Sequence, residues 1–118
     1  MSRFEEILDE KEIPVIAAGQ DGIIFFINRS FEDEYGWSED DLVGNALTII
    51  LPPYTRDAHN LGFARFLSTE AHRILDKKIS LPVYCKDGSV RKAAHFITGE
   101  KKDGEWQFAA LLDPQTGE

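Results

Sequence analysis

The apolar positions of this chain repeat with a helical period in its first helix and with a period of two in its last third. Residues 3–12 place Phe4, Ile7 and Leu8 at helical spacing, with Glu and Asp prominent at the other positions. This pattern predicts a short amphipathic helix. A helix of this length is not stable alone in water, so we expect its apolar stripe to pack against another surface.

Two β-rich runs follow this helix. Residues 13–18 read IPVIAA and residues 23–28 read IIFFIN, with Gln20, Asp21 and Gly22 between them. Two such runs around an Asp-Gly turn predict a β-hairpin.

Two short helices are expected next, because two serines each precede an aspartate by three positions. The pairs are Ser30 with Asp33 and Ser38 with Asp41. Both have the spacing of a capping box in which Asp replaces the usual Glu. Glycines at positions 36 and 44 are expected to end the two helices.

The longest helix of the core is predicted over residues 55–68. Residues 45–51 are expected to form one more helical turn before Pro52 and Pro53 break it. In the long helix, His59 shares one stripe with three apolar residues, Phe63, Phe66 and Leu67. A histidine on an apolar stripe is either a ligand for something inside the protein or a side chain along the edge of the helix.

The last third predicts three strands, over residues 74–85, 89–99 and 105–112. Lys86-Asp87-Gly88 and Lys102-Asp103-Gly104 separate them, and strands joined by such tight turns are antiparallel neighbours. Pro82 lies within the first strand, which indicates an edge strand or a bulge.

The order of elements predicts an α+β fold. If the hairpin joins the three-stranded meander, one five-stranded antiparallel sheet carries the short helices and the longer helix on one face. The other face is left for the N-terminal helix or for a second subunit. We therefore expect an N-terminal helix for capping or dimerisation in residues 1–12 and one domain in residues 13–118.

Length and charge narrow the function classes. A chain of 118 residues and 13.3 kDa is the size of one domain. The formal net charge of -8 disfavours nucleic-acid binding, which needs a basic patch. No apolar run approaches the roughly 20 residues that span a bilayer, and the first residues are too acidic for a signal peptide. Together with the single cysteine, Cys85, these features predict a cytoplasmic protein or a cytoplasmic piece of a larger protein.

Several motifs in this order resemble those of PAS domains. The segment DGIIFFINRSFEDEYGWSEDDLVGNAL is similar to the family's N-terminal signature, and ISLPVYCKDGSVRKAAHF is similar to its paired strands around a K-D-G turn. EWQFAALLDPQT resembles the last strand and the Asp-x-Thr element that leads into an effector, although Asp113 and Thr116 stand one residue further apart than usual. The resemblance covers about residues 13–116.

The resemblance implies a sensor or interaction module and not an enzyme. PAS domains bind haem, flavin, small metabolites or nothing, and they relay their state to a kinase, a cyclase or a transcription regulator. Many form homodimers through an N-terminal amphipathic helix, which would give residues 3–12 a purpose. A signalling role, as in a two-component system, with a partner effector in cis or in trans, is therefore expected.

Catalytic motifs are missing from the sequence. It contains no P-loop, dinucleotide-binding, zinc-protease or nucleophile-elbow pattern. The acidic groups at 32–34 and 39–41 lie in predicted first helical turns, where cap and dipole roles are expected. Cys85 lies on one strand face with Val83 and Leu81 and is expected to be a small buried hydrophobe. The photochemical flavin-binding PAS domains carry an Asn-Cys-Arg-Phe motif where this chain has NALTIILPP, so that chemistry is excluded and flavin is less expected than haem.

The stretch ILPPYTRDAHNLGFARF resembles the haem-bearing helix of FixL-type oxygen-sensor kinases. Carried over residue by residue, the resemblance implies that His59 is the axial ligand of the iron and that Arg65 lies near a haem propionate. A neutral imidazole on a helix that faces an apolar cavity can hold haem iron. The arginine that would contact bound oxygen is absent, because that position falls at Ile79, with Lys78 beside it.

A second distal position of the haem sensors falls at His95, whose orientation has two interpretations. If Arg91, Ala93, His95 and Ile97 face inward, His95 enters the pocket opposite His59 as a candidate second ligand. If Val90, Ala94 and Phe96 face inward, His95 is polar surface. The alternation does not decide, since both sets mix apolar and polar residues. His72 is expected to be exposed in the turn after the long helix.

Three hypotheses follow for the function. The first is a sensor of a ligand or cofactor, with haem on His59 as its sharpest form and a pocket lined by Phe63, Phe66, Ile79, Ile97 and Trp106. The second is a ligand-free dimerisation module, whose interior is filled by Phe25, Phe63, Phe66 and their neighbours. The third and weakest is a small enzyme with His59 or His95 as general base. We expect Trp106, Phe108, Ala110 and Leu112 to share one face of the last strand and to help close either the pocket or a dimer seam on the other side of the sheet.

Overall fold

The protein is described here from a computed structural model that covers residues 2–69 and 75–115, without the side chains at positions 62, 67 and 69. Five strands form one antiparallel sheet in the order β2-β1-β5-β4-β3. The strands are β1 (Val15–Gly19), β2 (Ile24–Ile27), β3 (Lys78–Tyr84), β4 (Val90–Lys102) and β5 (Glu105–Pro114). The predicted α+β fold with a five-stranded antiparallel sheet is confirmed.

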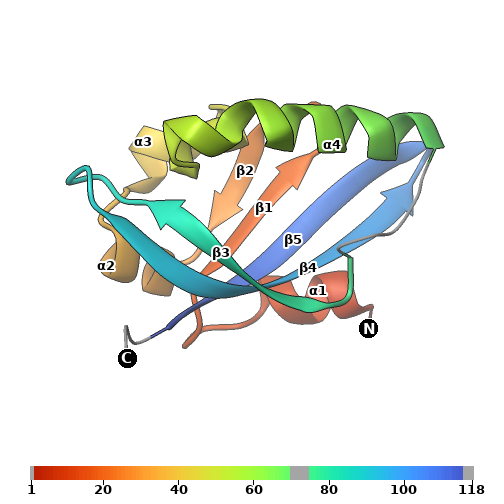
Figure 1. Ribbon diagram of the computed structural model, residues 1–118. Coiled ribbons are helices and arrows are strands. Elements are labelled where there is room, and N and C mark those ends of the chain that lie inside the picture. Colours follow the sequence, from red (N-terminus) through yellow and green to blue (C-terminus); the bar gives the residue numbers. More distant parts are fainter. Residues whose placement is uncertain (1, 70–74, 116–118) are drawn as a thin grey trace.

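The helices lie on both faces of this sheet (Figure 1). They are α1 (Arg3–Leu8), α2 (Arg29–Tyr35), α3 (Glu39–Leu42), the 3-10 turns η1 (Leu47–Ile50) and η2 (Pro53–Thr55), and α4 (Arg56–Thr69). In Figure 1, α4 runs across one face, here called the inner face, and α1 lies on the opposite, outer face. No helix in the described ranges is both long enough and apolar enough to cross a membrane.

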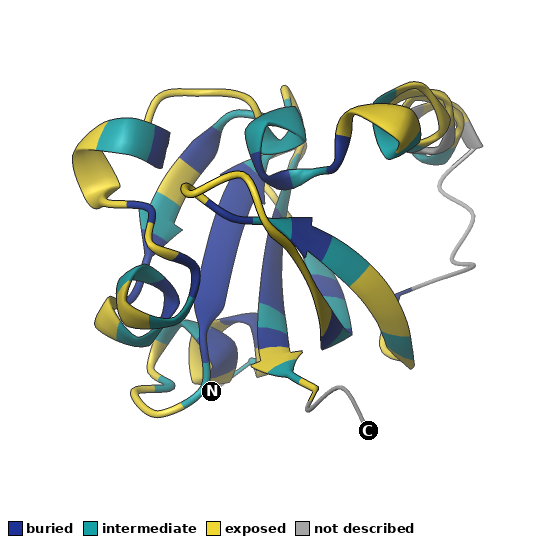
Figure 2. Cartoon of the chain, turned by 60° about the vertical axis from the view of Figure 1, so that its left-hand side comes forward, coloured by how far each residue is buried: buried dark blue, intermediate teal, exposed yellow. Residues whose placement is uncertain are grey.

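The main core lies between the inner face and the short helices. One row of side chains crosses four strands, because Ile27 faces Ile16, Ile16 faces Ala110 and Ala110 faces Ile97. Buried residues of the short helices and of η1 pack against this face of the sheet, namely Phe31, Tyr35, Leu42 and Ile50. Figure 2 shows that burial is concentrated in the central strands.

A second, smaller core forms on the outer face under α1. Phe4 and Ile7 are buried there against Val15, Ala17 and Ala109. The helix ends at Leu8 and not at residue 12 as predicted. Beyond it, the Glu10 carboxylate accepts the backbone N–H groups of Glu12 and Ile13 and so holds this segment in a non-helical turn. The apolar stripe that the sequence predicted is therefore buried within its own chain.

The hairpin of β1 and β2 contains a β-bulge. Ile27 and Phe26 pair with Ile16 and Ala17, but Ala18 pairs with Ile24, so Phe25 is the extra residue. The bulge places Ile24 and Ile27, three positions apart, in the same core. Phe25 is 43% exposed and does not fill the interior, which corrects the prediction for this residue.

Asn28, and not Ser30, is the N-cap of α2. Its side-chain oxygen accepts hydrogen bonds from the backbone N–H of Phe31 at 3.0 Å and of Val15 at 2.9 Å. Its amide nitrogen donates to the carbonyl oxygens of Glu10 at 3.0 Å and Ile13 at 2.9 Å. Ser30 lies within the helix and donates to the Glu12 carbonyl instead, so the predicted cap at Ser30 is wrong.

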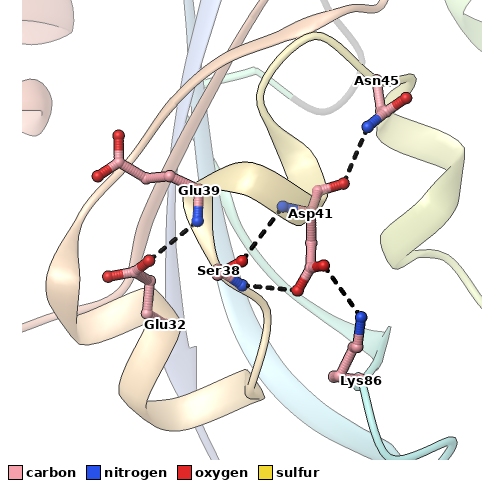
Figure 3. A network of polar contacts seen from close by, with 6 residues as sticks. All are labelled: Glu32, Ser38, Glu39, Asp41, Asn45 and Lys86. Carbon is pink, nitrogen blue, oxygen red and sulfur yellow. Dashed lines mark hydrogen bonds and ion pairs between the residues drawn. The ribbon is translucent and has the colours of Figure 1, made fainter.

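The predicted cap at Ser38 is confirmed. Ser38 and Asp41 form a reciprocal capping box at the start of α3, and the Asp41 carboxylate also pairs with Lys86 at 3.0 Å (Figure 3). The Glu32 carboxylate accepts the backbone N–H of Glu39. These carboxylates therefore have the cap and dipole roles expected for the acidic groups, and the hydrogen bond to the Ser38 backbone holds the pKa of Asp41 below its usual range.

Strand β3 is an edge strand and contains Pro82, as predicted. It begins at Lys78 and not near residue 74, since Asp76 adopts a left-handed backbone with φ 59° and interrupts the extended run. Strand β4 extends to Lys102, so the turn into β5 consists of Asp103 and Gly104, both with positive φ. An Asp-Gly pair suits such a turn, whose twist matches that of the strands.

We expect Asn28→Ala to lower the free energy of unfolding by about 3 kcal/mol, because it removes a helix cap and leaves buried backbone groups unpaired. Urea unfolding measures this change. Asn28→Asp keeps an acceptor oxygen for the two N–H groups but places a buried carboxylate oxygen against the Glu10 and Ile13 carbonyl oxygens, so a loss at least as large is expected. Asn45→Ala removes one exposed bond, to the Asp41 carbonyl, and is the control, with an expected loss of about 0.5 kcal/mol or less. An equal loss in Asn45→Ala and Asn28→Ala would contradict the role assigned to Asn28.

Candidate functional site

Aromatic rings fill the space between α4 and the inner face of β5. The ring of Phe63 meets Phe108 edge-on at 5.4 Å between centroids. Phe66 meets Trp106 at 5.0 Å and Phe108 at 5.4 Å, also edge-on. Rings at these separations are in direct contact. The prediction that Phe108 shares a face with Trp106, Ala110 and Leu112 agrees with this packing, because Trp106 stacks on Phe108 and the other two are buried in the main core.

A glycine on the neighbouring strand makes room for this cluster. A Cβ atom added at Gly99 of β4 would lie 3.2 Å from Phe108 and 3.3 Å from Leu75. Gly99 pairs directly with Phe108 in the sheet. The missing side chain therefore lets the Phe108 ring lie over β4, where α4 can cover it.

His59 lies at the margin of the aromatic cluster. Its imidazole stacks on Phe63 at 5.9 Å, and its Nδ1 atom is buried without a hydrogen-bond partner in the described part of the chain. Burial lowers the pKa of His59, and an interaction with the side chain of Asn60 opposes this effect more weakly. The ring is therefore neutral at neutral pH, as a ligating or hydrogen-bonding imidazole must be.

His59 also lines a cavity of about 410 Å³ that opens to solvent. The cavity lies where α4 passes the β1–β2 turn and the start of η1. Its walls are residues 20–22, residues 46–48 and, from α4, His59, Asn60, Phe63 and Ala64. A concave site that combines apolar walls with a few polar groups is the usual form of a small-molecule site. The sequence indicated His59 and Phe63 but not the turn or η1 residues, which only the fold brings to this place.

His95 is buried on the inner face, with 6% of its surface exposed. The two neighbours on its side of the strand, Ala93 and Ile97, belong to the main core or pack against it. The inward orientation is thus the one adopted, and Phe96 packs on the outer face under α1. The Nδ1 atom lies 3.0 Å from the Ala93 carbonyl oxygen, and burial lowers the pKa of the ring.

The predicted site residues fall into two groups. His59, Phe63, Phe66 and Trp106 belong to the cluster under α4. Half-buried Ile79 lies opposite His95 across β3 and β4, and half-buried Ile97 packs on the main core nearby. Arg65 is exposed on α4. No group of three His, Cys, Asp or Glu side chains in the described part of the chain is arranged to hold a metal ion. His72 and Thr116 lie outside the described residues.

Cys85 and Tyr35 are buried but structural. Cys85 is 4% exposed within the main core, as expected for a small buried hydrophobe, and burial raises the pKa of its thiol. The Tyr35 hydroxyl donates to the Leu112 carbonyl oxygen at 2.8 Å, and burial raises the pKa of Tyr35 far above its ordinary value. Neither side chain is poised as a nucleophile, since both are held in their neutral forms.

A larger surface hollow, of about 770 Å³, lies at the other side of the β1–β2 turn. It separates Phe25 from the β4–β5 turn, which projects beyond the end of β1. There the Gln20 side chain replaces a missing strand partner, because its oxygen accepts the Trp106 backbone N–H at 3.0 Å. Gln20 thus connects the wall of the His59 cavity to the strand that carries Trp106.

We expect Gly99→Ala to lower the free energy of unfolding by about 1–2 kcal/mol, because the added methyl group forces the Phe108 ring to shift. Urea unfolding measures the change. The control is the same substitution in a Phe108→Leu variant, where Gly99→Ala is expected to lower the free energy of unfolding much less. An undiminished cost in that background would show that the crowding does not involve Phe108.

Acid is expected to destabilise the protein through its buried histidine, His95. The pKa of His95 in the folded protein lies below the ordinary 6.5. As pH falls below 6.5, the unfolded chain therefore takes up a proton before the folded protein does, and the folded protein loses stability relative to it. One such histidine contributes a slope of up to about 1.4 kcal/mol per pH unit. Urea unfolding between about pH 5 and pH 7 should show a shallower slope for His95→Leu.

The control for this pH dependence is Asp87→Asn. A hydrogen bond from Ser89 lowers the pKa of Asp87, so this carboxylate loses its contribution only in stronger acid, as pH falls through that lowered value. The slope between about pH 5 and pH 7 should therefore be unchanged in Asp87→Asn. A His95→Leu variant with the same slope as the unmodified protein would contradict the assignment to His95.

Comparison with known proteins agrees with this geometry. A family model described as PAS fold matches residues 2–95. The chain is similar to the PAS domain of an HTR-like protein from Haloarcula marismortui, with 16% identity and a TM-score of 0.70 over 96% of this chain and 89% of that one. It is also similar to a PAS domain from Desulfitobacterium hafniense, with 14% identity and a TM-score of 0.73 over 93% and 99%.

A third similar structure is the dark structure of the blue-light photoreceptor Aureochrome1 LOV. The identity is 14% and the TM-score 0.72, over 99% of this chain and 86% of that one. At these identities the three structures establish a shared fold, whereas the family match extends over most of the sequence. The five-stranded sheet, the helix across its inner face and the match over residues 2–95 show that this chain belongs to the PAS family.

Proposed function

We propose that this domain is a sensor that binds a small molecule in the cavity at His59 and relays its presence to an effector. The observation that carries the proposal is the buried Nδ1 atom of His59, which has no hydrogen-bond partner in the described part of the chain and belongs to a ring that lines the cavity. A buried polar atom without a partner costs about 1–3 kcal/mol. A ligand that supplies the partner recovers this energy as affinity.

The proposed ligand is smaller than haem or flavin. A haem on His59 would have to enter between α4 and β5, where Phe63 and Phe66 are in contact with Phe108 and Trp106. The residues present therefore do not fit a macrocycle in this arrangement. The exposed position of Arg65 gives no added support for a propionate contact, so we propose a smaller ligand in place of haem.

The relay is proposed to run from α4 to β5 through the aromatic cluster. A ligand at His59 moves α4 relative to Phe108, and Phe108 belongs to the strand that leads to Pro114. Beyond the strand, the Gln115 backbone N–H still bonds to the Lys92 carbonyl oxygen at 3.0 Å. Because β5 leads toward the C-terminal side, a change there reaches an attached or partner kinase, cyclase or transcription regulator. The domain itself is proposed to have no catalytic activity.

The second candidate is a ligand-free module for homodimerisation. The filled interior under α4 favours it, since the rings already supply the contacts that a ligand would make. The α1 stripe is not available for this purpose, because Phe4 and Ile7 are buried on their own sheet. Tyr54 and Leu61, 77% and 71% exposed beside and on α4, are the most exposed large apolar side chains in the described part of the chain, and we propose them as the contact for a partner.

Native mass spectrometry and thermal melting test the sensor proposal. We expect the purified protein to carry a small molecule, or to acquire one from a deproteinised cell extract, and to melt at higher temperature when loaded. His59→Phe preserves ring packing and is expected to abolish both effects, whereas Ser68→Ala, exposed on the same helix, retains them. A protein that takes up nothing and whose melting temperature does not respond would favour the ligand-free module.

Hemin titration tests the size limit. We expect no Soret band, because the rings under α4 occupy the space. A Soret band that is lost in His59→Ala but kept in His72→Ala would overturn the smaller ligand in favour of haem.

A further inference from the structure

The cavity at His59 is poor in positive charge. Among the described residues that line it, Asp21 carries a formal charge and neither Lys nor Arg is present. The Asp21 carboxylate is fixed by the backbone N–H of Ile23, which it accepts at 3.0 Å. Sites that bind carboxylates or phosphates supply Arg, Lys or several aligned backbone N–H groups. This cavity instead presents a carboxylate at its wall, in a chain of net charge -8.

His59 does not supply the missing charge. Its half-buried ring stacks on Phe63, and this burial lowers the pKa of the imidazole, so it stays neutral at neutral pH. The neutral ring carries one donor nitrogen and one acceptor nitrogen and no net charge.

We infer that the cavity at His59 selects neutral and cationic molecules of about one ring in size and rejects carboxylates and phosphates. This inference rests on the proposed function and names the chemical class of its ligand. Its basis is the set of groups that the fold brings together: the β1–β2 turn, the start of η1 and one face of α4.

Three side chains provide the polar contacts for such a ligand. His59 has the unsatisfied Nδ1 atom, which reaches a ligand after a turn of the ring about its Cβ–Cγ bond. Gln20 uses its oxygen for the Trp106 backbone N–H, so its amide nitrogen is the part that can donate to a ligand. The Thr48 hydroxyl can both donate and accept. A neutral amide, or an amidine whose charge faces Asp21, complements this set.

The size limit follows from the volume and the apolar walls. The cavity of about 410 Å³ is near the lower end of the roughly 300–1,000 Å³ of small-molecule sites. Leu47 and Phe63 line it with apolar surface, which suits a flat ring. A ligand of this kind stacks beside Phe63 while its polar group meets His59.

Three probes of equal size separate the charge classes: benzamide is neutral, benzamidine is a cation and benzoate is an anion. Each is titrated into ¹⁵N-labelled protein at neutral pH, and the imidazole ¹⁵N signals of His59 are followed by NMR. We expect benzamide and benzamidine to shift these signals in a saturable way. Benzoate is expected to bind at least about tenfold more weakly, which corresponds to about 1.4 kcal/mol.

Matched variants assign the binding to this cavity. His59→Phe is expected to abolish the saturable shifts of the Thr48 backbone amide, and Ser68→Ala to leave them unchanged. Asp21→Asn keeps an oxygen for the Ile23 N–H. It is expected to weaken benzamidine several-fold and to leave benzamide unaffected.

The outcomes separate this inference from the proposed function. Benzoate that binds as tightly as benzamide overturns the charge selection. Probes that leave His59 unshifted also overturn it, and the proposed function still stands if a co-purified molecule shifts His59. If neither the probes nor any extract component shifts His59, the ligand class and the sensor proposal both fall.

Discussion

The side chain of Asn28 forms hydrogen bonds with three different parts of the fold. It caps α2, accepts the first N–H of β1 and donates to two carbonyl oxygens of the segment that connects α1 to β1. Because 8% of it is exposed, water cannot readily replace these bonds. One amide therefore fixes the connection from α1 on the outer face to β1 in the sheet and to α2 on the inner face. Through these bonds it also fixes the two cores relative to each other.

The same set of packing contacts between α4 and the sheet forms both the interior and the candidate site. Gly99 leaves room for Phe108, Phe108 meets Phe63 and Phe66, and α4 is held above β5 by these rings. The same contacts leave His59 at the end of the cluster, where its ring stacks on Phe63 and its Nδ1 atom is buried without a partner among the described residues. The ring contacts connect α4, which forms one wall of the cavity, to β5. The proposed function uses these contacts to carry the effect of a small ligand from α4 to β5.

Local signals in the sequence were reliable where the chemistry is local. The Asp-Gly turns, the Ser38 cap and the edge position of the Pro82 strand depend on a few neighbouring residues, and all three were predicted. The Ser30 cap was wrong because the same spacing also fits a serine inside a helix, and Asn28 offered a better acceptor. Strand β3 starts late because Asp76 adopts positive φ. This residue follows the isolated bridge between Leu75 and Ile97, a contact with another strand that the apolar pattern does not show.

By itself, the sequence determined the order of elements, the antiparallel sheet and the presence of His59 on an apolar helical stripe, because these follow from periodicity and turn chemistry. The tertiary structure alone decided which way His95 faces, because both faces of β4 mix apolar and polar residues and only the packing of Ala93 and Ile97 separates them. It also decided that the walls of the His59 cavity come from the β1–β2 turn and η1. Contacts between segments so far apart in the chain exist only once the sheet has formed.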